Sequence, residues 1–369
     1  MDSGNKNNVL FITSFSEISG SSRTIVFQFL PFLKKAGITY KVRIIYPDNF
    51  FKIQMGIEPA DKVKKRINLV FHLFLSLAKR FYYAVDAKNY EVVFIQKDVF
   101  PKSIFWFLRR LNPNVIYEFE ESFDHVNPFL KRGFLSGLML RYQLGLLKNM
   151  VEKAKLVIAV NDYIAETARK FNNRVIVICE PINTENIKPA KPEKHDIITL
   201  GWIGSPSTAS IFLKVIKSVF PELYKKHPNI RLKLVGAGNF SFSGIPIIKK
   251  DWHLNEELSD LHSFDIGLMP LDDGPFSKGH LGHKMIQYMC VGIPFVASNT
   301  GLNPLVVKNG VNGFLASSEE EWFEKLSLLI ENEDLRRQLG QNGRKIAEEL
   351  FSLEKLAKVF INVIEEAKQ

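Results

Sequence analysis

The feature of this sequence that most constrains its fold is a pattern of short apolar segments alternating with helix-period segments, which runs through the chain twice. This alternation is typical of parallel sheets with helices on both faces. The two runs are separated by residues 180–194, a polar stretch that contains three prolines and shows no hydrophobic period. A length of 369 residues also suits two or three domains. The sequence therefore predicts an α/β protein with two doubly wound halves.

Each half has its own set of expected elements. One helix is predicted over residues 24–36, ending at Gly37, and another over residues 209–224. Ser318, followed three residues later by Glu321, predicts the start of a further helix. Two helices, over residues 334–349 and 352–368, are expected to finish the chain. The predicted strands cover residues 9–13, 40–45, 92–95, 115–119, 156–160 and 175–178 in the first half and 197–202, 232–235 and 265–269 in the second.

The most specific motif lies between Gly279 and Leu315 and reads as a glycine loop, a helix, a tight turn, a buried strand and a glycine-rich return. Gly292 lies where a helix C-cap is expected, and a proline two residues later prevents continuation. The helix start has free N–H groups and the positive end of the helix dipole, so together with Lys278 and Lys284 it can hold a phosphate. The predicted helix has an apolar face of Leu281, Met285, Tyr288 and Met289 and an opposite face of His280, Lys284 and Gln287.

This motif resembles the donor-site segment of the group-1 retaining glycosyltransferases of family 4, which have the GT-B architecture. An ordinary α/β turn and strand is the alternative interpretation. The lysine followed by Gln-Tyr-Met in the helix is similar to one subgroup of these enzymes. The matching residues are the helix from Lys284 to Tyr288, Gly292-Ile-Pro294, Val296-Ala-Ser298, Gly301 and residues 309–314 (NGVNGF).

The resemblance implies two Rossmann-like domains facing across a cleft. Residues 1–183 would bind the acceptor, residues 184–350 would bind a nucleotide-sugar donor, and residues 351–369 would form a C-terminal helix that crosses back to the first domain. It implies that a sugar moves, with retention of configuration, to a glycan or lipid-linked acceptor in the synthesis of a cell-surface polysaccharide or glycoconjugate. The resemblance also implies that no metal and no other cofactor is used. Helix N-termini, backbone amides and lysines would then stabilise the departing diphosphate.

Two glycine-containing loops of the second half follow predicted strands, where a doubly wound domain binds its ligands. The hydroxyl side chains of the first loop are expected either to bind phosphate or to cap the next helix. The second loop, with Gly236 and Gly238, matches a loop beneath the donor nucleotide in the resembled family. Trp252 is expected either near the base of the nucleotide or half-buried as a packing residue. The residues of the first loop are Gly204, Ser205, Ser207 and Thr208.

The donor-site helix departs from the family at two positions. Many relatives carry two glutamates eight positions apart, where this chain has Gly279 and Gln287. Gln287 can still form a hydrogen bond with a ribose hydroxyl, but it carries no charge. We expect Lys284 to stabilise the departing phosphate and Asp272 or Asp273, just past a strand end, to take the sugar-facing role.

The first half has an acidic cluster directly after the strand predicted over residues 115–119. Glu120, Glu121 and His125 are candidates for accepting the acceptor's proton or binding its hydroxyls, and a solvated loop is the alternative. A further set follows the first strand, where an arginine can meet a phosphate of the donor or of a lipid-linked acceptor. The alternative for that arginine is an exposed helix start. This set consists of Gly20, Ser21 and Arg23.

The excess of positive charge lies entirely in the first half. The whole chain has a net charge of +10, and residues 186–369 contain equal numbers of basic and acidic side chains. A nucleic acid, an anionic membrane surface or a phosphorylated substrate would each explain this bias, but no nucleic-acid-binding signature is present, so no nucleic-acid partner is expected. Residues 67–78 are apolar between basic flanks and too short to span a bilayer. They are either a buried helix or a helix lying on lipid headgroups.

Two cysteines, Cys179 and Cys290, lie far apart without metal-like spacing, which favours a reducing cytosol. The basic first half leaves open an attachment to the inner face of the cell membrane. Two other functions remain open at this point. A nucleotide-sugar epimerase of similar two-domain form would need no acceptor. A non-catalytic binding subunit would keep the fold without turnover, and the missing glutamates are the reason to consider it.

Overall fold

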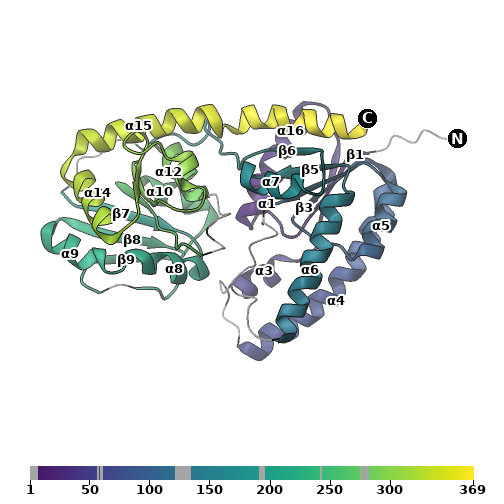
Figure 1. The fold of residues 1–369 in the computed structure, drawn as a ribbon, viewed down its shortest axis with the longest axis horizontal. Helices are drawn as coiled ribbons and strands as arrows, with labels where there is room; N and C mark the ends of the chain where they lie inside the picture. Colours follow the sequence, from purple (N-terminus) through teal and green to yellow (C-terminus); the bar gives the residue numbers. More distant parts are fainter. Residues whose placement is uncertain are drawn as a thin grey trace. The chain divides into compact units, whose positions relative to one another are not determined.

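The structure is a computed structural model that describes residues 7–55, 58, 61–120, 134–190, 196–241, 243–274, 277 and 282–369. The chain divides into two compact units. Unit 1 comprises Met1–Pro181 together with Leu353–Gln369, and unit 2 comprises Ile182–Ser352 (Figure 1). Each unit is a parallel α/β structure, and this confirms the predicted fold class.

Unit 1 is built on a six-stranded sheet in the order β2-β1-β3-β4-β5-β6, in which all neighbouring strands are parallel. The central strands are buried along nearly their whole length, as expected for a sheet covered on both faces. The strands are β1 (Asn7–Thr13), β2 (Tyr40–Ile44), β3 (Tyr90–Gln96), β4 (Val115–Phe119), β5 (Leu156–Ala159) and β6 (Val175–Val177).

In unit 1 the predicted C-terminal helix is present as α16, and the helix predicted near the start is not. The single helix predicted over residues 24–36 is wrong, because this stretch forms α1, a 3-10 turn and α2. Pro31, which lacks an N–H group, lies in the first turn of α2 and is incompatible with a continuous helix. The helices are α1 (Gly20–Ile25), η1 (Phe27–Phe29), α2 (Leu30–Lys35), α3 (Asp48–Met55), α4 (Lys62–Asp86), η2 (Ala87–Asn89), α5 (Lys102–Leu111), α6 (Phe134–Lys153), α7 (Asp162–Arg169) and α16 (Leu353–Lys368).

Unit 2 repeats the plan with a parallel sheet in the order β12-β11-β10-β7-β8-β9. The strands are β7 (Ile198–Ile203), β8 (Ile230–Val235), β9 (Ile247–Lys250), β10 (Ile266–Met269), β11 (Phe295–Ser298) and β12 (Phe314–Ala316). The helices are α8 (Pro206–Phe212), η4 (Leu213–Ile216), α9 (Val219–Lys226), η5 (Leu254–Glu256), α10 (Glu257–His262), α12 (His283–Cys290), α13 (Asn303–Val306), α14 (Glu319–Glu331) and α15 (Glu333–Leu350).

The expected helix caps of unit 2 are present, but one long helix is not. Gly292 has a φ of 71° directly after α12, and Ser318 accepts a hydrogen bond from the backbone N–H of Glu321 at the start of α14. The single helix predicted over residues 209–224 is wrong, since α8, η4 and α9 occupy this stretch. Pro221 lies in the first turn of α9, where a missing N–H group is tolerated.

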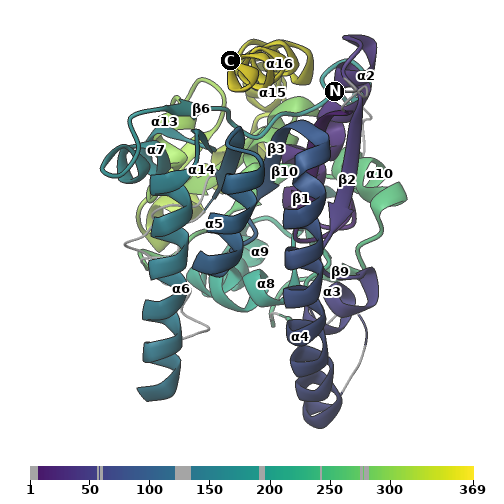
Figure 2. The same cartoon turned by 90° about the vertical axis from the view of Figure 1, so that its right-hand side faces the viewer.

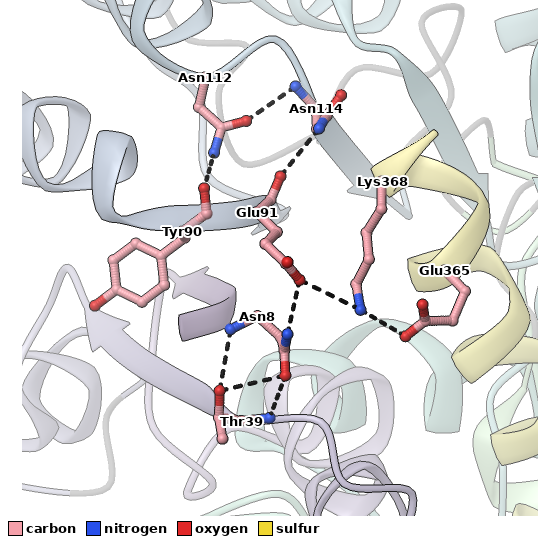
Figure 3. Close-up of polar contacts among 8 residues, drawn as sticks. All are labelled: Asn8, Thr39, Tyr90, Glu91, Asn112, Asn114, Glu365 and Lys368. Atoms are coloured by element: carbon pink, nitrogen blue, oxygen red, sulfur yellow. Dashed lines mark hydrogen bonds and ion pairs between the residues drawn. The ribbon is translucent and has the colours of Figure 1, made fainter. Parts of the chain in front are cut away.

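The last helix, α16, belongs to the core of unit 1. Phe360 is buried and stacks on Phe29 with ring centroids 4.3 Å apart. Phe94, on the central strand β3, lies 5.3 Å from the same ring. At the end of the helix, Lys368 Nζ lies 3.4 Å from Glu91 Oε2, which also accepts a hydrogen bond from Asn8 (Figure 3). The C-terminal helix is therefore fastened both to the sheet's hydrophobic face and to its N-terminal edge.

Candidate functional site

The first candidate loop of unit 2 connects β7 to α8. The backbone N–H of Gly204 donates to the carbonyl of Val235, which ties the loop to the neighbouring strand β8 at 3.0 Å. Ser205 and Thr208 form a reciprocal capping box at the start of α8, with hydrogen bonds of 3.2 and 3.4 Å. Ser207 lies in the first turn of this helix. The capping alternative is thus realised for Ser205 and Thr208.

The second loop approaches the first so closely that its residues must be small. Gly236 has a φ of 74°, and a Cβ atom added there would lie 2.2 Å from the carbonyl oxygen of Gly204. Gly238 has a φ of 60°, and its added Cβ would lie 3.1 Å from Pro206. The two loops therefore lie against each other at the carboxyl ends of β7 and β8, where ligands bind in doubly wound domains.

We predict that Gly236→Ala destabilises unit 2 and weakens ligand binding, because the new methyl group must push the two loops apart. A loss of more than about 2 kcal/mol in the free energy of unfolding is expected. Gly310→Ala is the matched control, since Gly310 has a φ of 76° but its nearest foreign atom would lie 3.8 Å from the added Cβ. That variant should lose only about 1 kcal/mol, the cost of the left-handed backbone. Urea denaturation measures both, and equal losses would contradict the close approach.

Lys284, on α12, lies against the first loop. Its Nζ atom is 5.3 Å from the ring centroid of Trp202, and its Cε atom would be 3.0 Å from a Cβ added to Gly204. Helix α12 is held in place by Tyr288, whose hydroxyl donates to the carbonyl of Leu268 at 3.2 Å. Burial raises the pKa of this tyrosine well above its ordinary value, so it stays a neutral donor. The predicted lysine and the predicted glycine loop are therefore adjacent.

Trp252 and Gln287 are brought together by a residue that the sequence analysis missed. Glu257 accepts a hydrogen bond from Trp252 Nε1 at 2.9 Å and another from Gln287 Nε2 at 3.1 Å. Trp252 is half-buried, and Gln287 is buried. The only sequence signal for Glu257 is its place at the start of a short helix after β9, a strand too short to be recognised from its pattern.

The helix that carries Glu257 is anchored by a buried carboxylate. Asp260 accepts hydrogen bonds from Lys233 Nζ and Lys250 Nζ, both at 2.8 Å. These lysines come from β8 and β9, so two neighbouring strands fix the position of α10. Glu257 is thus held on a rigid support rather than on a loop.

Of the two acidic residues after β10, Asp272 stabilises the local turn. Asp272 Oδ1 accepts a hydrogen bond from Ser277 Oγ at 2.5 Å and one from the Gly274 backbone N–H at 3.3 Å. Asp273 is exposed. The candidates Lys278, Gly279 and His280 lie outside the described residues.

In unit 1, two candidates predicted separately meet at the carboxyl ends of β1, β3 and β4. Ser21 Oγ donates a hydrogen bond to Glu120 Oε1, although the two residues are far apart in sequence. Lys97 Nζ forms an ion pair with Glu120 Oε2 at 2.9 Å. Gln96 Nε2 donates to Ser21 Oγ at 2.8 Å. The rule that polar residues after strands gather at one sheet edge would also have identified Gln96 and Lys97.

This cluster contains a buried acid and a strained backbone. Glu118 is fully buried, and neither carboxyl oxygen has a hydrogen-bond partner among the described residues. Burial raises the pKa of Glu118 well above its ordinary value, and the nearby Glu120 raises it further. Lys97 has a φ of 58°, unusual for a side-chain-bearing residue and typical of functional sites.

We predict that Glu118→Gln stabilises the protein at pH 8 by about 1–3 kcal/mol, because glutamine removes the cost of a buried carboxylate. A raised pKa in the folded state means that stability is full below the ordinary carboxyl pKa and is lost as the pH rises. The gain should therefore vanish near pH 4, where the unfolded chain also binds the proton. Glu354→Gln, at an exposed position on α16, is the control and should change little. Melting temperatures across this pH range measure the effect, and a gain independent of pH would contradict it.

The remaining candidates of unit 1 lie around the start of α1 or outside the described residues. Gly20 is exposed at the start of α1, and Arg23 is half-buried with Nη1 3.4 Å from the carbonyl of Glu17. Glu121 and His125 lie outside the described residues. Within the described ranges, no group of three or more His, Cys, Asp or Glu side chains is arranged to hold a metal ion.

The segment around α12 is similar in sequence to a known protein family. Residues 261–346 match the family model of the glycosyl transferases group 1. This match includes Lys284, Gln287 and the turn at Asp272. It supports the resemblance to group-1 glycosyltransferases that was drawn from the sequence.

Several curated proteins are similar to parts of this chain. Spore coat protein SA of Bacillus subtilis is 22% identical over 178 residues, 41% of this chain and 44% of that protein. An uncharacterized glycosyltransferase of Methanocaldococcus jannaschii is 34% identical over 137 residues, 37% of this chain and 33% of that protein. The capsular polysaccharide biosynthesis glycosyltransferase CapM of Staphylococcus aureus is 25% identical over 174 residues, 43% of each chain. The chain thus spans less than half the length of these three relatives.

Solved structures match the chain over nearly its whole length. HepE from Anabaena, in complex with UDP and glucose, has a TM-score of 0.63 at 13% identity and covers 98% of this chain and 100% of its own. Sucrose-phosphate synthase from Thermosynechococcus elongatus has a TM-score of 0.69 at 15% identity, covering 97% of this chain and 98% of its own. At such identities these similarities establish the fold, which is the two-domain GT-B architecture.

Proposed function

We propose that this protein is a retaining hexosyltransferase of family 4 that moves a sugar from a nucleotide-sugar to a glycan or lipid-linked acceptor. Its product would be a cell-surface polysaccharide or glycoconjugate. The observation that carries the proposal is that Lys284, Gly204 and Gly236 lie together at one sheet edge, in a unit whose residues 261–346 match the group-1 glycosyltransferase model. CapM, a relative by sequence, acts in capsular polysaccharide biosynthesis according to its name.

Unit 2 is proposed to bind the donor. HepE binds UDP and glucose, and a nucleoside diphosphate carries two phosphates that need donors of hydrogen bonds and positive charge. The backbone of the two glycine loops offers close approach, and Lys284 beside them supplies the charge. Glu257 is an acceptor of hydrogen bonds and is suited to ribose hydroxyls, with Gln287 beside it as a partner.

The chemistry assigned to these groups is electrostatic. As the bond between sugar and diphosphate breaks, negative charge grows on the leaving phosphate oxygen and the sugar becomes oxocarbenium-like. An ammonium group placed at that oxygen favours the transition state over the ground state. Lys284 is the catalytic residue proposed for this role. No step requires a metal or another cofactor in this scheme.

Unit 1 is proposed to bind the acceptor through the Ser21, Gln96, Lys97 and Glu120 cluster. The carboxylate of Glu120 is oriented by a hydroxyl and an ammonium group, so it can accept a hydrogen bond from an acceptor hydroxyl. Arg23 and Lys97 offer positive charge for a phosphate on a lipid-linked acceptor. Glu121 and His125 remain further candidates on sequence grounds.

A two-stage experiment tests this function. First, a panel of nucleotide-sugars is screened by thermal shift on the purified full chain, since a ligand at 100 times its Kd stabilises by about 2.7 kcal/mol. The stabilising donor is then incubated with and without glycan acceptors, and the anomeric configuration of the product is determined by NMR. Transfer to an acceptor with retention supports the proposal. Conversion of the donor to another nucleotide-sugar without acceptor would indicate an epimerase, and no binding or turnover would indicate a non-catalytic subunit.

A further inference from the structure

Over most of its length, helix α4 of unit 1 buries polar side chains and exposes apolar ones. Its buried side carries the polar residues His72, Ser76 and Arg80, four positions apart, each less than 10% exposed. Its outer side carries large apolar residues, among which Phe74 is 72% and Ile67 is 66% exposed. A surface helix of a globular protein normally shows the opposite arrangement. An apolar stripe of this length on the outside indicates an interaction surface.

The orientation of α4 is fixed by its buried polar side. Arg80 forms two hydrogen bonds of 2.7 Å with Asp98 and donates to Ser76 Oγ at 2.6 Å. Lys79 Nζ donates to the carbonyl of Ile45 at 2.7 Å. Turning the apolar side inward would break this buried ion pair, at a cost of about 3–5 kcal/mol. The apolar stripe is therefore held outward by the fold itself.

The helices on this side of unit 1 are strongly basic. Figure 2 shows α4, α5 and α6 side by side, and contacts join α4 to α5 and α5 to α6. Together they contain 12 Lys and Arg against 2 Asp and Glu, a net charge equal to that of the whole chain. Trp106 on α5 and Tyr142 on α6 are exposed aromatic residues of the kind that favour the boundary between water and lipid.

We propose that the outer face of α4, defined by Ile67, Val70, Phe71, Phe74, Leu77 and Phe81, lies on the surface of an anionic phospholipid bilayer. Apolar side chains would enter the headgroup region while the flanking Lys64 and Arg66, both exposed, meet the lipid phosphates. A second copy of the chain would bring two basic faces together, which electrostatic repulsion disfavours. No helix within the described ranges is both long and apolar enough to cross a bilayer.

Binding to vesicles tests this proposal independently of sugar transfer. The full chain is sedimented with vesicles of phosphatidylcholine alone or with 30% phosphatidylglycerol, at low and high salt. We expect binding to the anionic vesicles that weakens at high salt. Phe71→Gln/Phe74→Gln should weaken it by about tenfold or more, because each phenylalanine loses apolar burial. Leu305→Gln, at an equally exposed apolar position in unit 2, should bind as the wild type does.

Two further measurements keep the test decisive. Lys64→Gln/Arg66→Gln should weaken binding to anionic vesicles without changing the apolar stripe, which covers the case of a poorly folded phenylalanine variant. Melting temperatures verify the fold of each variant. Equal sedimentation of wild type and both double variants would overturn the proposal. So would a dimer seen by analytical ultracentrifugation without lipid and lost in Phe71→Gln/Phe74→Gln, because a second copy would then cover the face.

Discussion

Replacing Lys284 with alanine is expected to lower the kcat of sugar transfer by about 10²–10³, the usual effect of removing one preorganised group that stabilises developing charge. The lysine lies beside Gly204 and over Trp202, where its ammonium group can meet a phosphate. The apparent Kd for the donor should also rise. Steady-state kinetics and a ligand titration of the variant measure the two effects.

Lys325→Ala is a matched control for this experiment. Its ammonium group also lies over an aromatic ring, 5.6 Å from the centroid of Phe314, in the same unit but on α14. Both variants lose a cation–π contact worth about 0.5–1 kcal/mol, so their melting temperatures should fall by similar small amounts. Only Lys284→Ala should lose turnover. If both variants keep wild-type kinetics, Lys284 has no role in phosphate stabilisation.

Replacing Phe360 with alanine is expected to destabilise unit 1 by about 3–5 kcal/mol, the range for a buried phenylalanine truncated to alanine. Its ring is buried between Phe29 and the central strand residue Phe94, so the variant leaves a cavity in the middle of the core. Urea denaturation followed by circular dichroism measures the loss.

Val359→Ala on the same helix is the control. It distinguishes the loss of core packing from a change in helix propensity. Val359 is exposed, and its replacement should change the free energy of unfolding by less than about 0.5 kcal/mol. A loss for Phe360→Ala no larger than that for Val359→Ala would show that α16 does not form part of the unit 1 core in solution.

The sequence was a good guide to the strands because each is a short, continuous apolar run. β4 has the bounds predicted for it, and β2, β5 and β6 differ by one residue at one end. Long helices were predicted less well where a proline interrupts them. Pro31 and Pro221 both lie inside predicted helices, and in both places the chain forms shorter pieces. The hydrophobic period of a segment does not show that a proline within it lacks an N–H group.

A residue of the candidate site could be predicted only where its own type and its position after a strand or in a helix indicate a function. Gly204, Gly236 and Lys284 lie together as their positions after strands and in a helix suggested. Glu257 could not be found, because its partners Trp252 and Gln287 come from segments that meet only in the folded chain. The orientation of α4 could not be predicted either. A helix with one apolar and one polar side does not reveal from its sequence which side faces the core.

The return of α16 to unit 1 has a consequence for biosynthesis. While the chain is being made, the first 181 residues emerge without the helix that completes their core, and the whole of unit 2 must be synthesised before Phe360 appears. At about 5–20 residues per second this leaves Phe29 and Phe94 without the ring of Phe360 for the order of ten seconds or more. Unit 2, which is continuous in sequence, can fold first, and the nascent N-terminal region is the part expected to need a chaperone.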